Sequence, residues 1–280
     1  MTATVAVVTD STAGLPAQDT ARHGIRVVPL RVVAGEQACD DEPRALPEAL
    51  AAQVRDGARL STASPAPAVF TAAYAAARAA GARAVVSVHI SKGLSGTVNS
   101  ATLAAAGAPL PVRVVDSRSL GMGLGFAAMA AAEAANAGGS LEDVTAAAVG
   151  RAARLRSFFV LDALDRLSAG GRLDAPPGGA ARLTARALLH VAGGQVEVLE
   201  KVRTWSAAIR RLEEVAAQFA TGQPVDLAVQ YLGSAQRATA LAGSLETLIP
   251  TARRRYLTEA GRVILAHTGP GMLGVVVAPF

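Results

Sequence analysis

Apolar stretches of two kinds alternate along the first 155 residues. Residues 84–90 are apolar or β-branched at nearly every position and contain neither glycine nor proline, which predicts a strand buried on both faces of a parallel sheet. The strands expected in this part are 4–9, 26–33, 84–90 and 112–115, and the helices are 16–24, 46–54, 67–80, 97–105, 122–137 and 141–155. This alternation predicts a three-layer α/β domain over residues 1–155, with a mainly parallel sheet covered by helices on both faces.

The pattern changes after about residue 155, where hairpins are mixed with helices. Gly193 and Gly194 separate two strand-like stretches and predict a two-residue hairpin. The strands expected here are 158–161, 188–191, 195–202, 226–230, 254–257 and 273–277, and the helices are 162–169, 206–219 and 234–248. Hairpins mixed with helices imply a mixed sheet, so residues 156–280 are predicted to form a separate α+β domain.

The polar loop 91–97 follows the central predicted strand and leads into a predicted helix. Free backbone N–H groups, a helix dipole and three hydroxyls favour an anion at such a place. The loop contains no Walker motif, no dinucleotide fingerprint and no hydrolase elbow, because Thr97 stands where the elbow needs a glycine. The alternative is that Gly93 and Gly96 only turn the chain, and that Ser95 or Thr97 caps the helix.

Two further strands end in the same pair of residue types. Asp10 and Ser11 follow the first predicted strand, and Asp116 and Ser117 follow the strand 112–115. Ligands of open α/β sheets gather at the carboxyl ends of the strands, so these four residues are candidates for a wall of the site. The alternative is an Asx or Ser/Thr turn that leads into the next helix. The acidic residues 40–42 are expected in an exposed hairpin or loop.

Two other segments carry polar side chains in backbone held by proline. Pro65 and Pro67 keep the segment 61–67 extended, so that it can present the hydroxyls of Thr62 and Ser64 to a ligand. His267 is expected in a short Gly/Pro loop between apolar segments, either facing a ligand or as an ordinary core or surface residue. Phe70 and Tyr74 share one face of the helix 67–80 and are expected in the core.

Composition narrows the class of protein. The chain of 280 residues is 51% hydrophobic, contains no apolar run long enough to span a bilayer, and does not begin like a secretory signal. Its single cysteine, Cys39, allows no internal disulfide and no cysteine-based metal site. The net charge of +5 suggests nucleic-acid binding, but the arginines are dispersed and aromatic residues are only 4%. We expect a soluble cytoplasmic protein that binds no nucleic acid and no metal.

Taken in order, these motifs resemble the DegV family of bacterial fatty-acid-binding proteins, which includes the FakB-type subunits of fatty acid kinase. The resemblance covers nearly the whole chain and includes Asp-Ser-Thr at 10–12, Gly-Leu-Ser-Gly-Thr at 93–97, Gly-Gly-Arg at 170–172 and His-Thr-Gly-Pro-Gly at 267–271. The matching blocks are 5–12, 62–70, 90–100, 115–125, 158–173, 197–204 and 267–271. The chain departs from the family pattern at Ala63, Ser64 and Lys92, where serine, glutamine and a second serine are usual, so the hydrogen bonds to the head group are expected to differ.

The resemblance implies a fatty-acid site between the two domains. Thr62, Ser95, Gly96 and His267 would hold the carboxylate, and an apolar tunnel would hold the tail. The protein would not be a catalyst and would need no cofactor; it would present the fatty acid to a separate kinase subunit, and the acyl-phosphate would enter phospholipid synthesis. Arg203 and Arg172 are candidates for docking this partner. No stable membrane insertion is expected, only transient contact to exchange lipid.

Two other functions stay open on the sequence alone. A small hydrolase could use Ser95 and His267 with Asp10 or Asp116, because these residue types satisfy the inventory of a catalytic triad. A regulator that binds a sugar, a nucleotide or another small anion could use the same loop at 91–97.

Overall fold

The computed structural model describes residues 4–41, 59–162, 164, 167–168, 170–173 and 186–280. The chain divides into two compact units, each made of two segments. Unit 1 contains Met1–Ala153 and Gly261–Ala266, and unit 2 contains Arg154–Ala260 and His267–Phe280. The helix expected at 46–54 and part of the helix expected at 162–169 lie outside the described residues.

Unit 1 is built on a parallel sheet, as the sequence predicts. Its strand order is β2-β1-β6-β7, and every neighbouring pair runs parallel. The strands are β1 (Val5–Asp10), β2 (Arg26–Val28), β6 (Ala84–His89) and β7 (Val112–Asp116). All six residues of β6 are buried, which accounts for its uninterrupted apolar pattern and places the loop that follows it at the centre of the carboxyl edge.

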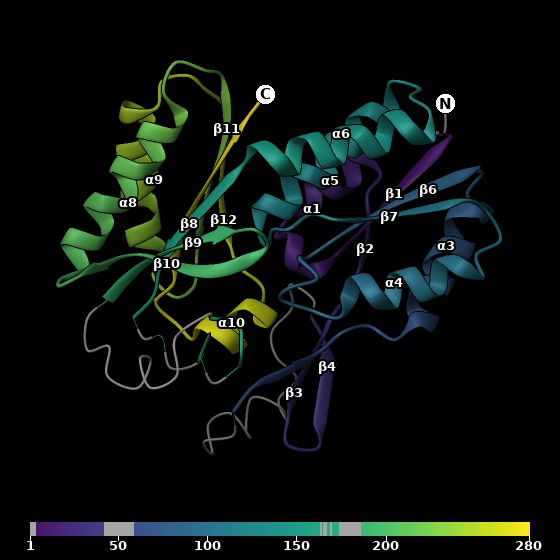
Figure 1. The fold of residues 1–280 in the computed structure, drawn as a ribbon, viewed down its shortest axis with the longest axis horizontal. Helices are drawn as coiled ribbons and strands as arrows, with labels where there is room; N and C mark the ends of the chain where they lie inside the picture. The colour runs from purple at the N-terminus through teal and green to yellow at the C-terminus, as the bar shows by residue number, and fades with distance from the viewer. Residues whose placement is uncertain (1–3, 42–58, 163, 165–166, 169, 174–185) are drawn as a thin grey trace. The chain divides into compact units, whose positions relative to one another are not determined.

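Helices cover both faces of this sheet (Figure 1). The helices in the described part of unit 1 are α1 (Ala17–His23), α3 (Pro67–Ala79), α4 (Thr97–Ala106), α5 (Met122–Asn136) and α6 (Leu141–Arg154), with a 3-10 turn, η1, at Ser11–Ala13. The predicted core aromatics Phe70 and Tyr74 are fully buried between α3, α4 and the sheet. Alanine-rich α5 packs on the opposite face against β1 and β6.

A small antiparallel sheet corrects two predictions. It contains β3 (Arg31–Ala34), β4 (Gln37–Asp40) and β5 (Ser61–Ala63) in the order β4-β3-β5. The single strand expected at 26–33 is in fact β2 and β3, which belong to different sheets and are separated by Pro29, whose missing N–H interrupts strand pairing. Of the acidic residues 40–42, which were expected to be exposed, Asp41 retains only 6% of its accessible surface, and residue 42 lies outside the described residues.

Unit 2 contains a six-stranded mixed sheet, which confirms the predicted second fold. Its order is β10-β9-β8-β13-β11-β12, antiparallel throughout except for the parallel pair β11 and β12. The strands are β8 (Arg156–Val160), β9 (Arg186–Ala192), β10 (Gln195–Val202), β11 (Val225–Tyr231), β12 (Ala252–Glu259) and β13 (Leu273–Pro279). Gly193 and Gly194 join β9 to β10 with φ of 59° and 90°, the positive values that a type I′ hairpin turn requires.

Two helices of the described residues pack on this sheet, and a third, shorter helix begins in the segment 261–266 of unit 1. Helices α8 (Trp205–Ala220) and α9 (Ala235–Leu248) bury their apolar stripes against alternate residues of the strands, such as Leu227, Val229 and Val275. Helix α10 (Arg262–Thr268) was not predicted. It corrects the placement of His267, which stands in the last turn of this helix and not in a Gly/Pro loop.

Candidate functional site

The polar loop after β6 lies where the carboxyl ends of three parallel strands meet. Its backbone is fixed by internal and neighbouring hydrogen bonds: the N–H groups of Leu94 and Ser95 donate to the carbonyl of Ser91, and that of Ser91 donates to the carbonyl of Ser119. Helix α4 then begins at Thr97, with Gly96 as its N-cap and no side chain capping it there. The first turn of α4 therefore offers N–H groups and a positive dipole end at this loop.

Three hydroxyl groups meet at the start of α4. The Oγ of Ser95 lies 2.8 Å from the Oγ1 of Thr97 and 3.2 Å from the Oγ of Ser64. A Cβ atom at position 96 would lie 3.2 Å from the Ser64 Oγ, so Gly96 allows the segment after β5 to come close to the loop. The structure thus brings together Ser64, Ser95 and Gly96, all named from the sequence.

Thr62 reaches the same region from β5. It pairs with Val32 in the small antiparallel sheet, is half-buried, and stands two residues before Ser64 on the proline-held segment. The prolines at 65 and 67 keep the chain extended as far as the start of α3. Thr62 therefore belongs to the same rigid segment that delivers the Ser64 hydroxyl to the loop.

Asp10 is completely buried, and its carboxylate is occupied by groups of its own unit. One oxygen accepts hydrogen bonds from the N–H and the hydroxyl of Thr12, at 3.1 and 2.5 Å, and the other lies 3.0 Å from His89 Nδ1 and 2.9 Å from the N–H of Ile90. Because Ile90 immediately precedes the polar loop, Asp10 fixes the start of that loop. The turn interpretation accounts for Asp10 at least as well as contact with a ligand.

His89 was overlooked because it stands inside an otherwise apolar strand. Its Nε2 lies 2.6 Å from the Oγ of Ser87, which in turn accepts a hydrogen bond from the Tyr74 hydroxyl at 3.0 Å. Asp10, His89 and Ser87 thus have the hydrogen-bond order of a catalytic triad, but all three are 0% exposed. The Ser87 hydroxyl cannot meet a substrate there, so we assign this chain of hydrogen bonds to holding β6 and β1 together.

The second aspartate pair also fixes backbone. One oxygen of Asp116 accepts hydrogen bonds from the N–H groups of Lys92 and Arg118, at 3.2 and 2.9 Å. Ser117 donates its N–H to the carbonyl of His89 at 3.0 Å, and its hydroxyl binds the carbonyl of Ser119. These contacts tie the loop 91–97 to the end of β7.

Unit 2 contributes His267, Arg172 and Arg203. Burial, together with the positive charge of Arg172, lowers the pKa of the His267 imidazole to about 4. The imidazole is therefore neutral at pH 7, with one N–H donor and one acceptor nitrogen. Arg203 is exposed just after β10, and the next residue, Thr204, caps α8 by accepting the N–H of Ala207 at 3.1 Å.

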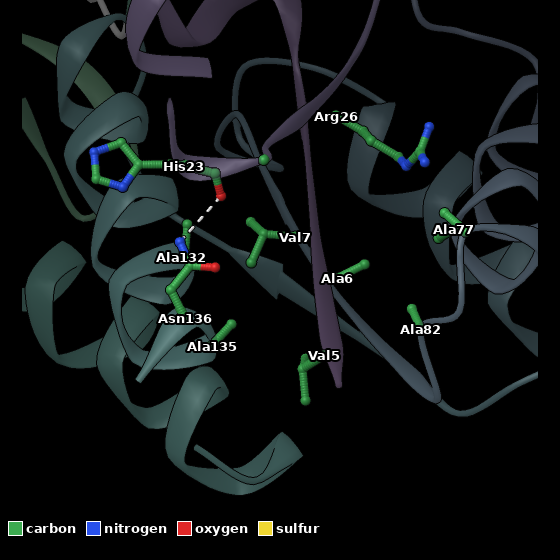
Figure 2. Close-up of a pocket in the computed structure, with 12 residues that line it drawn as sticks. Val5, Ala6, Val7, His23, Arg26, Ala77, Ala82, Ala132, Ala135 and Asn136 are labelled. Carbon is green, nitrogen blue, oxygen red and sulfur yellow. Dashed lines mark hydrogen bonds between the residues drawn. The ribbon is translucent and has the colours of Figure 1, made fainter. Parts of the chain in front are cut away.

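A pocket of about 150 Å³ lies elsewhere in unit 1, at the amino-terminal end of β1 (Figure 2). Val5 and Val7 point toward α5, Ala6 points toward Ala77 and Ala82, and the His23 ring points away from the strand. The amide of Asn136 binds the carbonyl of His23. This pocket lies at the opposite end of β1 from the hydroxyl cluster.

The described residues contain neither a metal-binding cluster nor a membrane-spanning helix. None of their His, Cys, Asp and Glu side chains form a group of three or more that could hold a metal ion. Among the helices in the described part of the chain, none is both long and apolar enough to cross a membrane.

Comparison with known proteins gives one consistent result. Residues 4–279 match the family model for the DegV family, described as uncharacterised proteins. A DegV domain-containing protein of Streptomyces coelicolor is 47% identical over 276 residues, which cover 98% of each chain. Protein DegV of Bacillus subtilis is 31% identical over 275 residues, which cover 97% of this chain and 98% of that protein.

Two solved structures are similar over the full length. The structure of DegV from Bacillus subtilis, a fatty-acid-binding protein, superimposes with a TM-score of 0.90 at 30% identity and covers 100% of both chains. A DegV family protein from Thermus thermophilus, whose structure concerns fatty-acid binding, gives a TM-score of 0.86 at 33% identity and covers 99% of both chains.

Proposed function

Because the chain belongs to the DegV family, we propose that it binds a long-chain fatty acid and presents it to a separate kinase subunit. The observation that carries the proposal is the likeness, over the whole length of both chains, to the fatty-acid-binding DegV of Bacillus subtilis. The hydroxyl cluster at the start of α4 supports it independently, because such a cluster suits a carboxylate.

We assign the carboxylate to Thr62, Ser95, Gly96 and His267. A fatty-acid head group is an anion that must leave bulk water beside its apolar tail, and its burial without partners would cost several kcal/mol. Hydroxyl and N–H donors offset this cost through charge-assisted hydrogen bonds. The Ser95 hydroxyl now exchanges hydrogen bonds with Ser64 and Thr97, so it can rotate toward a ligand without losing every partner.

The tail accounts for most of the affinity in this proposal. Each buried CH₂ contributes about 0.8 kcal/mol, so a 16-carbon tail gives roughly 10 kcal/mol before the entropy of binding is subtracted. The head-group contacts then fix which end of the ligand is presented. A protein with this role needs no catalytic residue or cofactor of its own.

The kinase partner is the further part of the proposal. The partner would transfer phosphate from ATP to the presented carboxylate, and the acyl-phosphate would enter phospholipid synthesis. Arg203, exposed at the corner between β10 and α8, is our candidate for docking. Arg172, whose positive charge lowers the pKa of the His267 imidazole, is our second candidate for docking.

Binding of a fluorescent fatty acid to three variants tests the site. Ser95→Ala, Thr62→Val and His267→Ala should each raise Kd about tenfold, because each removes a hydrogen bond to a charged group. The matched control is Thr102→Ala, which removes an exposed hydroxyl of α4 that donates to the carbonyl of Val98 in the same helix. Melting curves check that each variant is folded. Unchanged affinity in all three variants would contradict the assignment of these residues to the fatty-acid carboxylate.

A further inference from the structure

Helix α10, which carries His267, has its N-terminus held by a residue far away in the chain. The residues before it, Ala260 and Gly261, have no side chain that could cap a helix. Instead, Asp41 Oδ1 accepts the N–H of Arg262 at 3.0 Å, across 221 residues of sequence. The positive end of the helix dipole also stabilises a negatively charged carboxylate at this position.

Asp41 is itself fixed on three sides. Its second oxygen accepts a hydrogen bond from the Ser11 hydroxyl at 2.8 Å, and its own N–H donates to the carbonyl of Leu30 at 2.7 Å. The Ser11 Oγ in turn accepts the N–H of Leu30 at 3.1 Å. Ser11 and Leu30 therefore leave the Asp41 carboxylate little freedom to turn away from the helix.

Close packing accompanies these hydrogen bonds. A Cβ atom at position 261 would lie 3.1 Å from Asp41 Oδ2, so Gly261 allows the carboxylate to approach. Val263, in the first turn of α10, packs in an apolar cluster with Leu30 and Val32. Both polar and apolar contacts within unit 1 thus hold the first turn of α10.

Because α10 is short, its stability depends on these contacts at its first turn. The helix has seven residues, and isolated helices so short are unstable in water, because too few hydrogen bonds offset the cost of nucleation. His267 stands five residues after Arg262, about 7.5 Å further along the axis. The orientation of the imidazole therefore depends on how the first turn is held.

We propose that Asp41, held in place by Ser11, is a positioning residue for His267: it caps α10 and so sets the direction of the imidazole toward the fatty-acid carboxylate. The inference rests on the proposed function, in which His267 binds that carboxylate. It also gives Ser11 a role different from the site wall that the sequence suggested, since its hydroxyl acts through Asp41.

The test combines NMR of the His267 imidazole with fatty-acid affinity. Asp41→Ala should shift the imidazole resonances of the ligand-free protein and raise Kd for a fluorescent fatty acid about tenfold. Asp41→Asn should keep both the imidazole resonances and the Kd close to their wild-type values, because its amide oxygen can still accept the N–H of Arg262. The matched control is Asp40→Ala, an adjacent carboxylate that is 53% exposed and pairs only loosely with Arg31, at 3.9 Å; it should change neither readout.

A double variant separates positioning from general damage. Asp41→Ala combined with His267→Ala should bind no more weakly than His267→Ala alone, because Asp41 acts through the imidazole. The proposal would be overturned if Asp41→Ala weakened binding as much in the His267→Ala protein as in the wild type. It would also be overturned if Asp41→Ala left the imidazole resonances unchanged. If His267→Ala alone binds normally, the head-group assignment fails, and the resonances then decide the role of Asp41. If Asp41→Ala does not fold, Ser11→Ala takes its place with the same expected results.

Discussion

At the scale of single residues, the neutral state of His267 has a measurable consequence. Its pKa of about 4 in the folded protein lies below the ordinary 6.5, so this group favours folding above pH 6.5, and its contribution is lost as the pH falls toward 4. A carboxylate beside the imidazole favours the charged form and raises the pKa again. A bound fatty acid should therefore draw a proton onto His267.

Calorimetry can count this proton. At about pH 5.5 the imidazole of the free protein, with its pKa of about 4, is largely neutral, so a fatty acid that raises this pKa should draw a fraction of a proton onto His267. The measurement is the heat of binding in two buffers with different enthalpies of ionisation. The variant His267→Gln lacks this uptake, whereas any proton that the fatty acid's own carboxyl loses on binding is common to both proteins. Equal net proton exchange by both proteins would contradict the placement of His267 beside the carboxylate.

At the scale of elements, the sequence predicted those whose pattern is local. The strand β6, the helix α3 with its N-terminal proline and the Gly193–Gly194 hairpin follow from periodicity and turn chemistry. Helix α10 could not be predicted in this way, because its cap is Asp41, which is distant in sequence. For the same reason the acidic stretch was expected to be exposed, although Asp41 is buried against that helix.

The corner between β10 and α8 allows a test of docking at this scale. Thr204 caps α8, so Arg203→Ala should leave the helix, the melting temperature and lipid binding unchanged. If Arg203 docks the kinase, phosphorylation of the bound fatty acid by the partner should fall about tenfold or more, as for a hot-spot arginine. Arg210→Ala, on the exposed face of α8, is the control. Lost lipid binding, or phosphorylation equal to that of the control, would remove Arg203 from the docking surface.

At the scale of the whole molecule, the sequence predicted which residues lie near the loop better than it predicted what each of them does there. Ser64, Ser95 and Gly96 do meet at one loop, because strand ends and prolines fix the backbone that carries them. Asp10 and Asp116 instead hold the loop backbone, a role decided by neighbours in the folded sheet. Both folds, parallel and mixed, were predicted. The site between domains 1–155 and 156–280 stays a prediction.

Mass spectrometry of the purified protein tests fatty-acid binding most directly. Native spectra should show one bound molecule per chain, and the organic extract of the denatured protein should contain a long-chain fatty acid. A protein that is purified empty should take up one equivalent of added fatty acid, with Ser95→Ala and His267→Ala retaining less. An empty protein that takes up no added fatty acid would contradict the proposed function, and Ala63, Ser64 and Lys92 would be the first positions to restore to the family pattern.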